Sequence, residues 1–264
     1  MSAPSLSVQA LGFGHRRPLF SPLSIDCRSG EVWAVLGANG CGKSTLFATI
    51  SGALKPLAGQ VSAGDGISVV PQSFRPAFGW RVQEVVLMGR ARRVSLFGQP
   101  SAADEMRVTA ALAQLGIAHL AQRPFNRLSG GQQQLVMIAR ALVGGSETIL
   151  LDEPCSALDL ANQQAVLQLI SDLARRQGRC VLFSTHDPAH AARVASHALL
   201  LLPGGEWLAG ESGKVLTEEA LQRACGLPVR RLTPGDGAEP LLAPLFTPPA
   251  LRGPPAAETT VPGR

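Results

Sequence analysis

The chain reads Gly37-Ala38-Asn39-Gly40-Cys41-Gly42-Lys43-Ser44 directly after an apolar run at residues 32–36. The fixed positions fit the pattern G-x-x-x-x-G-K-[ST], in which backbone N–H groups surround a phosphate. The apolar run predicts a strand and residues 44–50 predict a helix, which is the context that the pattern requires. An ordinary glycine-rich turn between strand and helix is the alternative. We predict a phosphate-binding loop made by Gly37, Asn39, Gly40, Cys41, Gly42, Lys43, Ser44 and Thr45.

Two carboxylates follow another apolar run. Residues 148–151 predict a buried strand, and Asp152 and Glu153 come directly after it. In open parallel sheets, ligands bind at the carboxyl ends of the strands, so these side chains are expected near the phosphates. Ser44 and Asp152 can then hold Mg²⁺, while Glu153 is placed to polarise an attacking water. Capping of the next turn by the two carboxylates is the alternative.

Strand and helix patterns alternate along the chain, which predicts an α/β architecture with a largely parallel sheet. The segment between Pro71 and Ser146 lacks clear strand patterns and is interpreted as an inserted helical unit, at about residues 74–146. The expected strands are 6–8, 23–25, 32–36, 67–70, 148–151, 180–184 and 198–202. The expected helices are 44–50, 112–120, 135–142 and 165–173.

The composition excludes several classes of protein. Of the 264 residues, 45% are hydrophobic and 16% are charged, which excludes disorder of the whole chain. The longest stretch without Asp, Glu, Lys or Arg has 15 residues, fewer than the roughly 18 that a membrane-spanning helix needs. Residues 228–264 are rich in proline, and we expect this tail to be extended or disordered, with no chemistry of its own.

The patterns of charge and cysteine limit which binding partners and which cellular compartment we expect. The formal net charge is +5, from 24 basic and 19 acidic residues. The basic residues occur in pairs and triplets without an aromatic stacking platform, which favours solvated surface over a nucleic-acid site. The five cysteines are scattered and form no C-x-x-C pair, which fits a reducing, cytosolic compartment.

A third motif narrows the family. The segment Leu128-Ser129-Gly130-Gly131-Gln132 ends 20 residues before Asp152. Placed between the phosphate loop and the acidic strand, this segment makes the chain resemble the ATP-binding cassette (ABC) family of P-loop NTPases. Further matches follow at Gln72, at Ser156-Ala157-Leu158-Asp159 and at His186, and the resemblance extends from about Leu6 to Leu227. One cassette over residues 1–227 is therefore expected.

The resemblance implies a fold and a set of roles. The fold would be an ABC nucleotide-binding domain with a RecA-like core, an antiparallel β subdomain and an inserted helical subdomain. Family members bind ATP and Mg²⁺ and work as head-to-tail dimers, in which Ser129, Gly130, Gly131 and Gln132 reach the nucleotide of the other chain. Asp159 would communicate between the two nucleotide sites. Gln72 would contact the metal or the water, and His186 would hold the γ-phosphate and orient Glu153.

Some positions depart from the family pattern. The family usually stacks an aromatic residue on adenine, and the matching position here is His15, with Phe13 as a less favoured substitute. Cys41 lies beside Lys43 at a helix start, which favours a reactive thiolate; a small packing residue is the alternative. His186 and His190 stand four residues apart as in a zinc helix, but Pro188 lies between them and Asp187 replaces the required glutamate.

The resemblance also implies partners. Membrane-spanning segments are absent from the sequence, so separate integral-membrane permease subunits are expected, with a periplasmic or surface substrate-binding protein acting through them. The permease would contact Gln72 to Arg93 through Phe74, Phe78, Trp80 and Val85–Met88, unless these residues form the subdomain's own core. Residues 85–90 and the helical insert that follows resemble importers of metal chelates (siderophore iron, haem, cobalamin), and residues 157–163 and 184–188 resemble the molybdate/tungstate branch. The chain would then act at the cytoplasmic face of the inner membrane.

Two other classes were weighed. A soluble cassette ATPase in translation or DNA repair would carry two cassettes or long coiled-coil or zinc insertions, which this sequence lacks. A small P-loop kinase would have no use for the segment Leu128–Gln132. An ATPase of a membrane importer, without nucleic acid as a partner, is the function that we expect.

Overall fold

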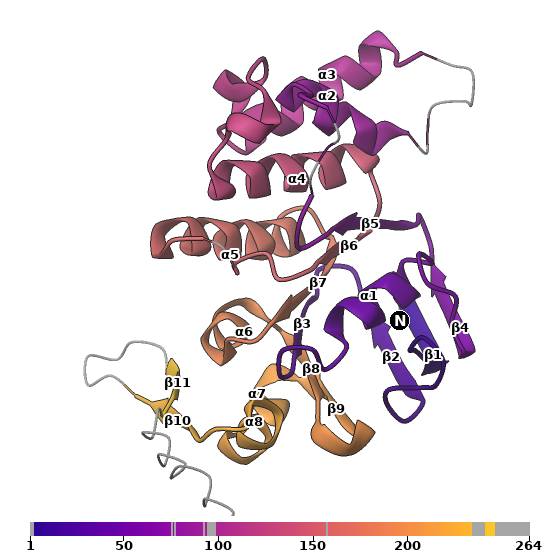
Figure 1. Cartoon of the computed structure of the whole chain (residues 1–264), viewed down its shortest axis with the longest axis vertical. Coiled ribbons are helices and arrows are strands. Elements are labelled where there is room, and N and C mark those ends of the chain that lie inside the picture. The colour runs from indigo at the N-terminus through magenta and orange to yellow at the C-terminus, as the bar shows by residue number, and fades with distance from the viewer. Residues whose placement is uncertain are drawn as a thin grey trace, which may run out of the picture.

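The computed structural model describes residues 3–74, 76, 78–91, 93, 99–156, 158–233 and 241–245. Within them, a six-stranded sheet with the order β5-β6-β7-β3-β8-β9 forms the centre of the molecule (Figure 1). Its first five strands are parallel and β9 is antiparallel to β8. The strands are β3 (Val32–Leu36), β5 (Ile67–Val70), β6 (Thr148–Leu151), β7 (Cys180–Thr185), β8 (His197–Leu201) and β9 (Trp207–Glu211).

Both faces of the sheet are buried, and β3 shows how. Val32, Ala34 and Leu36 belong to one hydrophobic core together with residues of α5 (Leu160–Arg175) and α6 (Pro188–Val194). The alternate residues Trp33 and Val35 belong to the other core, with α1 (Lys43–Ile50). Successive side chains of a strand point to opposite faces, so an uninterrupted apolar run is what a strand covered on both sides requires.

A second, antiparallel sheet lies beside α1 and has the order β2-β1-β4 (Figure 1). Its strands are β1 (Leu6–Gly12), β2 (Leu23–Cys27) and β4 (Ala58–Ala63). The sequence predicted parts of β1 and β2 but missed β4, whose residues are mostly exposed and show no apolar alternation. This sheet is the antiparallel β subdomain that the resemblance implied.

The helical unit forms the upper part of Figure 1 and contains α2 (Val82–Leu87), α3 (Ala102–Gln114) and α4 (Gly130–Gly144). Three short 3₁₀ helices, Met88–Arg90, Ala118–Leu120 and Phe125–Arg127, connect them. The prediction of one helix over 112–120 was wrong, because α3 ends before Gly116, which has a φ of +69°. A left-handed backbone at glycine ends a helix.

The C-terminal part contains α7 (Ser212–Val215), α8 (Glu218–Cys225) and a hairpin of β10 (Val229–Leu232) and β11 (Leu241–Pro244). The hairpin lies beside α6 and α8 (Figure 1). Two segments of the predicted proline-rich tail are therefore paired strands, with Val229 opposite Pro244 and Leu232 opposite Leu241. Residues 246–264 of that tail lie outside the described residues. None of the described helices is both long and apolar enough to cross a membrane.

Candidate active site

The phosphate-binding loop runs from the end of β3 to the start of α1. Gly40 and Gly42 have φ angles of +74° and +117°, and Gly42 occupies the N-cap position of α1. A Cβ atom at Gly42 would approach the Leu19 side chain to 2.8 Å. The Leu19 side chain is exposed and can move aside, so it is the backbone angle that requires glycine at position 42.

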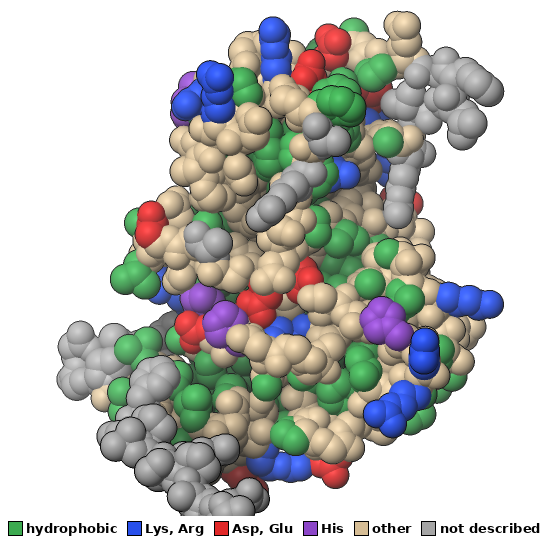
Figure 2. All heavy atoms as spheres, viewed as in Figure 1, with side chains coloured by type: hydrophobic (Ala, Val, Ile, Leu, Met, Phe, Trp, Pro, Cys, Tyr) green, Lys and Arg blue, Asp and Glu red, His purple; other side chains and the backbone are tan. Residues whose placement is uncertain are grey.

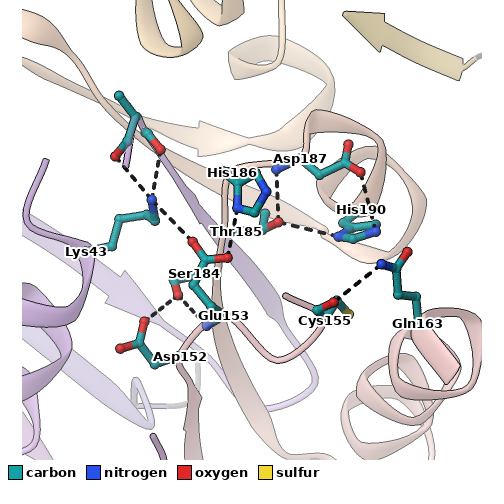
Figure 3. A network of polar contacts seen from close by, with 12 residues as sticks. Lys43, Asp152, Glu153, Cys155, Gln163, Ser184, Thr185, His186, Asp187 and His190 are labelled. Carbon is teal, nitrogen blue, oxygen red and sulfur yellow. Dashed lines mark hydrogen bonds and ion pairs between the residues drawn. The ribbon is translucent and has the colours of Figure 1, made fainter. Parts of the chain in front are cut away.

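Lys43 is buried and its ammonium group is held by the loop itself. Its Nζ donates hydrogen bonds to the carbonyl oxygens of Gly37 at 2.9 Å and Ala38 at 3.3 Å. The same nitrogen forms an ion pair with Glu153 Oε1 at 3.3 Å. Figure 3 shows the lysine side chain pointing at the carboxylate across the site. The structure thus brings together the two motifs that lie 110 positions apart in the sequence.

Glu153 is held in an unusual backbone conformation. Its φ is +48°, in the left-handed region that non-glycine residues seldom adopt. The backbone N–H of Glu153 donates to Ser184 Oγ at 2.7 Å, and Ser184 Oγ donates to Asp152 Oδ1 at 2.6 Å. Ser184 therefore connects both acidic residues. Strained residues of this kind concentrate at functional sites.

Ser184 was given no role by the sequence analysis. It is the second-last residue of the buried strand β7, and β6 and β7 are parallel with Leu151 opposite Phe183, which places Ser184 beside Asp152. The signal was a polar, fully buried residue at the carboxyl end of an apolar run. Its hydrogen-bond partners could be identified only from the pairing of the two strands.

We expect Ser184→Ala to lower the turnover number for ATP at least tenfold. The change leaves the Glu153 N–H without an acceptor, and a buried unpaired donor costs about 1–3 kcal/mol. Steady-state phosphate release and thermal unfolding measure both effects. Ser51→Ala is the control, because Ser51 Oγ donates only to the nearby Ala48 carbonyl at 3.1 Å. Unchanged turnover in Ser184→Ala would contradict a positioning role for this hydroxyl.

His186 reaches Glu153 from the side opposite to Lys43 (Figure 3). Its Nδ1 lies 3.0 Å from Glu153 Oε2, and its side chain is half exposed. His190 instead contacts Thr185 Oγ1 at 3.5 Å and Asp187 Oδ2 at 3.5 Å, and burial lowers the pKa of its imidazole. Within the described residues no group of three or more His, Cys, Asp or Glu side chains is placed to hold a metal, so the zinc alternative finds no support there.

These side chains border an open cavity of about 520 Å³ at the carboxyl ends of the parallel strands. In Figure 2 histidine, acidic and basic side chains gather near the middle of the displayed face, as this site requires. Asp152 does not line the cavity; it is linked to the cavity residue Glu153 through the hydroxyl of Ser184. The lining residues are Asn39, Gly40, Gly42, Lys43, Ser44, Thr45, Gln72, Glu153, Ser156 and His186.

The segment Leu128–Gln132 lies at the start of α4, outside the lining of the 520 Å³ cavity. Ser129 is exposed and caps α4, where its Oγ accepts from Gln132 N–H at 3.3 Å and its own N–H donates to Gln132 Oε1 at 3.2 Å. A Cβ atom at Gly131 would approach the Asn162 side chain to 2.9 Å. None of the described residues that line the 520 Å³ cavity comes from this segment. The predicted nucleotide-binding residues form two groups, one at the cavity and one at the start of α4, and Gly130 of the second group shares an adjoining pocket with Gln72 and Glu153 of the first.

Asn162 connects the second group and was also missed by the sequence analysis. Its backbone N–H donates to Asp159 Oδ1 at 2.8 Å, and its Nδ2 donates to Asp159 Oδ2 at 3.0 Å. Asp159 caps α5, so the start of α5 packs directly against the start of α4 at Gly131. Ala157, which precedes this contact, lies outside the described residues.

Three aromatic or thiol predictions have different outcomes. His15 is exposed, whereas Phe13 is buried and stacks on Phe20 with ring centroids 5.4 Å apart, so Phe13 is not available to a nucleotide. Burial raises the pKa of the Cys41 thiol and outweighs the opposing effect of Lys43. This direction and the position of Cys41 Sγ against Gly37 favour the packing alternative, while the reactive thiolate stays an untested prediction.

The predicted permease contacts also separate into two groups. Val85 and Val86 are fully buried inside the helical unit, and Phe74 packs edge-on against Phe125 at 5.6 Å. Phe78 and Trp80 remain exposed, at 72% and 38%, and contact each other edge to face. The core alternative is therefore correct for the valines and not for the exposed aromatic pair.

The chain has relatives with known names and structures. Residues 20–156 match the family model described as ABC transporter. The molybdate import ATP-binding protein MolC of Haemophilus influenzae is 43% identical over 85% of this chain and 89% of its own length. The iron(3+)-hydroxamate import ATP-binding protein FhuC of Bacillus subtilis is 36% identical over 83% of this chain and 87% of its own.

A solved structure, an inward-facing conformation of a metal-chelate type ABC transporter, superposes with a TM-score of 0.87. It is 41% identical and covers 92% of this chain and 98% of that one. The match extends through the core sheet, the antiparallel sheet and the helical unit, which confirms the predicted fold. The chain therefore belongs to the ABC transporter family and is one of its ATP-binding, ATP-hydrolysing subunits.

Proposed function

We propose that this chain hydrolyses ATP for a membrane importer of a metal chelate or metal oxyanion, of the iron-siderophore, haem, cobalamin or molybdate class. The observation that carries the proposal is the likeness to import ATP-binding proteins over more than four-fifths of the chain. Lys43, Glu153 and His186 supply the matching chemistry at one cavity. The chain would work at the cytoplasmic face of the membrane as a peripheral subunit.

The site suits Mg²⁺ as the partner of ATP. Mg²⁺ prefers oxygen ligands and uses few protein groups beside the phosphates. Ser44 and Gln72 border the cavity with a hydroxyl and an amide oxygen, and the carboxylate of Asp152, which precedes the cavity residue Glu153, is held by Ser184. These three residues would hold the metal, which neutralises charge on the phosphates when it is bound. Glu153 would accept a proton from the attacking water, with His186 orienting its carboxylate.

A second copy of the chain would complete each site. Ser129, Gly130 and Gly131 lie at the N-terminus of α4, where backbone N–H groups bind anions; Ser129 and Gly130 are exposed and Gly131 is buried. Because these residues do not line the cavity of their own chain, a head-to-tail pair would bring each segment to the nucleotide of the partner. Asp159 and Gln132 lie at the starts of α5 and α4 and would face the same interface.

The permease would bind beside Phe78 and Trp80. These two exposed aromatic side chains follow Gln72 along the chain and precede α2. Aromatic residues supply much of the binding energy at protein interfaces. Gln72 lines the nucleotide cavity and precedes these aromatic residues along the chain. It would therefore contact both the nucleotide and the permease.

Deletion of the gene tests the transport function. We expect uptake of one of four labelled probes, molybdate, a ferric hydroxamate, haem or cobalamin, to be lost from the deletion strain. The wild-type chain should restore this uptake and a Lys43→Ala chain should not. Normal uptake of all four probes in the deletion strain would contradict the proposed class of cargo.

His15 would stack on the adenine base, and its removal tests that role. We expect His15→Ala to weaken ATP binding by about 1–3 kcal/mol, the range measured for base–aromatic stacking, while His15→Tyr binds as tightly or more tightly. Titration with a fluorescent ATP analogue measures both. His119→Ala is the control, since His119 is an exposed histidine of the helical unit. Equal affinities of His15→Ala and the wild type would show that the base contacts no aromatic side chain here.

A further inference from the structure

A second cavity of about 410 Å³ lies at the amino ends of β3 and β8, whereas the nucleotide site lies at the carboxyl ends of the parallel strands. Val32 borders it at the start of β3, whereas the phosphate loop begins after Leu36 at the other end of this strand. At about 3.3 Å per residue, the two sites lie roughly 16 Å apart along the strand. The hairpin closes the cavity through Arg231 and Leu242, and α5, α6 and α7 supply its other walls.

The cavity is strongly basic. Arg175, Arg193 and Arg231 line it, and no acidic side chain does among the described residues. The side chains of Arg175 and Arg193 form no hydrogen bond or ion pair with any described residue. The Arg231 side chain donates to the Leu216 carbonyl oxygen at 3.2 Å and pairs with no described carboxylate. All three arginines are exposed, and the carboxylate of Glu218 accepts the backbone N–H of Arg231 at 2.8 Å from outside the cavity.

Neighbouring arginines outside the cavity behave differently. Arg176 pairs with Asp172 at 3.1 Å, and Arg230 pairs with Glu218 at 2.6 Å. Arg176 and Arg230 are each adjacent in sequence to an arginine of the cavity, but both form an ion pair with a carboxylate. An anion between the three arginines would gain electrostatic attraction from each of them, weakened by solvent screening because the side chains are exposed.

A buried hydroxyl points to the same conclusion. Ser212 Oγ is buried and has no hydrogen-bond partner among the described residues, and Ser212 lines the cavity. The hydroxyl of Ser196, also on the wall, is already satisfied by the backbone of Val32. Buried polar atoms of native proteins are normally paired, and a water molecule, an ion or a ligand supplies the partner where the protein does not.

We propose that this cavity binds a doubly charged tetrahedral oxyanion, either free phosphate or the phosphate group of a small ester. Guanidinium groups match phosphate oxygens with paired N–H donors, and Ser212 would donate one more hydrogen bond. The volume falls in the range of small-molecule sites and exceeds the space of a single ion. Val32, Val194, Leu216 and Leu242 would contact the remainder of an ester. Binding would hold the hairpin against α6, because Arg193 and Arg231 come from these two elements.

Isothermal titration of the full chain tests the site, with inorganic phosphate and glycerol 3-phosphate as probes. The titrations use a Lys43→Ala chain as the parent, which weakens anion binding at the phosphate loop. We expect one phosphate per chain, with affinity at least tenfold weaker after Arg175→Gln or Arg193→Gln. Arg176→Gln is the matched control and should change the affinity less than twofold. Circular dichroism verifies that each variant is folded.

Hydrogen exchange gives a second, local measurement. We expect bound phosphate to slow amide exchange over 229–232 in the parent and not in Arg193→Gln. Tighter binding of glycerol 3-phosphate than of phosphate identifies an ester as the ligand; equal or weaker binding identifies the free ion. The proposal is overturned if the parent binds neither probe, if both arginine variants bind as the parent does, or if hairpin exchange is unaffected by phosphate.

Discussion

Glu153→Gln is expected to retain ATP and to lose nearly all hydrolysis, by about 10²–10⁴-fold, the usual contribution of a general base. Glutamine keeps the shape of the side chain but cannot accept a proton from water. The change also removes the negative charge that lies 3.3 Å from Lys43 Nζ, which leaves the lysine free to meet phosphates. ATP affinity should therefore stay equal or rise. Phosphate release and titration with a fluorescent ATP analogue measure the two effects separately.

Glu147→Gln is the matched control for this experiment. Glu147 is exposed and immediately precedes β6, so Glu147→Gln removes the same charge at the opposite end of this strand, away from the cavity. Its hydrolysis rate should equal that of the wild type. Size exclusion with MgATP should show Glu153→Gln as a dimer, because ATP persists between the chains. Steady hydrolysis by Glu153→Gln near the wild-type rate would remove Glu153 from its proposed role.

Ser129→Arg is expected to abolish hydrolysis although it leaves the phosphate loop of its own chain intact. Ser129 is exposed at the start of α4 and does not line its own cavity, so the bulky charged side chain would obstruct the nucleotide of the partner chain. Loss of the helix cap alone costs about 0.5–2 kcal/mol. Ser101→Arg controls for that loss, because Ser101 caps α3 with the same reciprocal pattern of hydrogen bonds.

Mixing two inactive chains distinguishes action between chains from action within one. Lys43→Ala disables the phosphate loop, and Ser129→Arg disables the segment that serves the partner. A mixed dimer then contains one intact site and one site with both defects. We expect ATPase activity to reappear in the mixture, up to half of the wild-type value per mixed dimer if the sites act independently. Full activity of Ser129→Arg alone would contradict the head-to-tail arrangement.

The core sheet could be predicted closely from the sequence. The bounds of β3, β5 and β6 match the predictions to the residue, because each is an apolar run that ends at a glycine, a proline or an acidic residue. Strands β4 and β9 were missed, since both are exposed on much of their surface and carry no such run. The hairpin was missed for a different reason. Its pairing depends on contacts with α6 and α8, which composition does not encode.

The site could be predicted where its residues are contiguous in sequence. The phosphate loop and the acidic pair each occupy one short segment and therefore appear as motifs. Ser184 bonds to Asp152 and Glu153 across two paired strands, and Asn162 of α5 packs against Gly131 of α4, so strand pairing and helix packing identify them. The burial of side chains could not be predicted either, because the sequence shows which groups are present but not how deeply they lie. Burial keeps Phe13 from contacting a nucleotide and raises the pKa of the Cys41 thiol.

The left-handed backbone conformation of Glu153 lowers the stability of the fold, whereas the proposed catalytic role requires its carboxylate. A non-glycine residue in this conformation costs about 1–2 kcal/mol, and glycine would adopt it freely. A chain selected only for stability would carry glycine at position 153, and such a chain would lack the carboxylate between Lys43 and His186. Screens for heat resistance would therefore enrich an inactive protein. Selection for growth on the imported nutrient would keep the less stable glutamate.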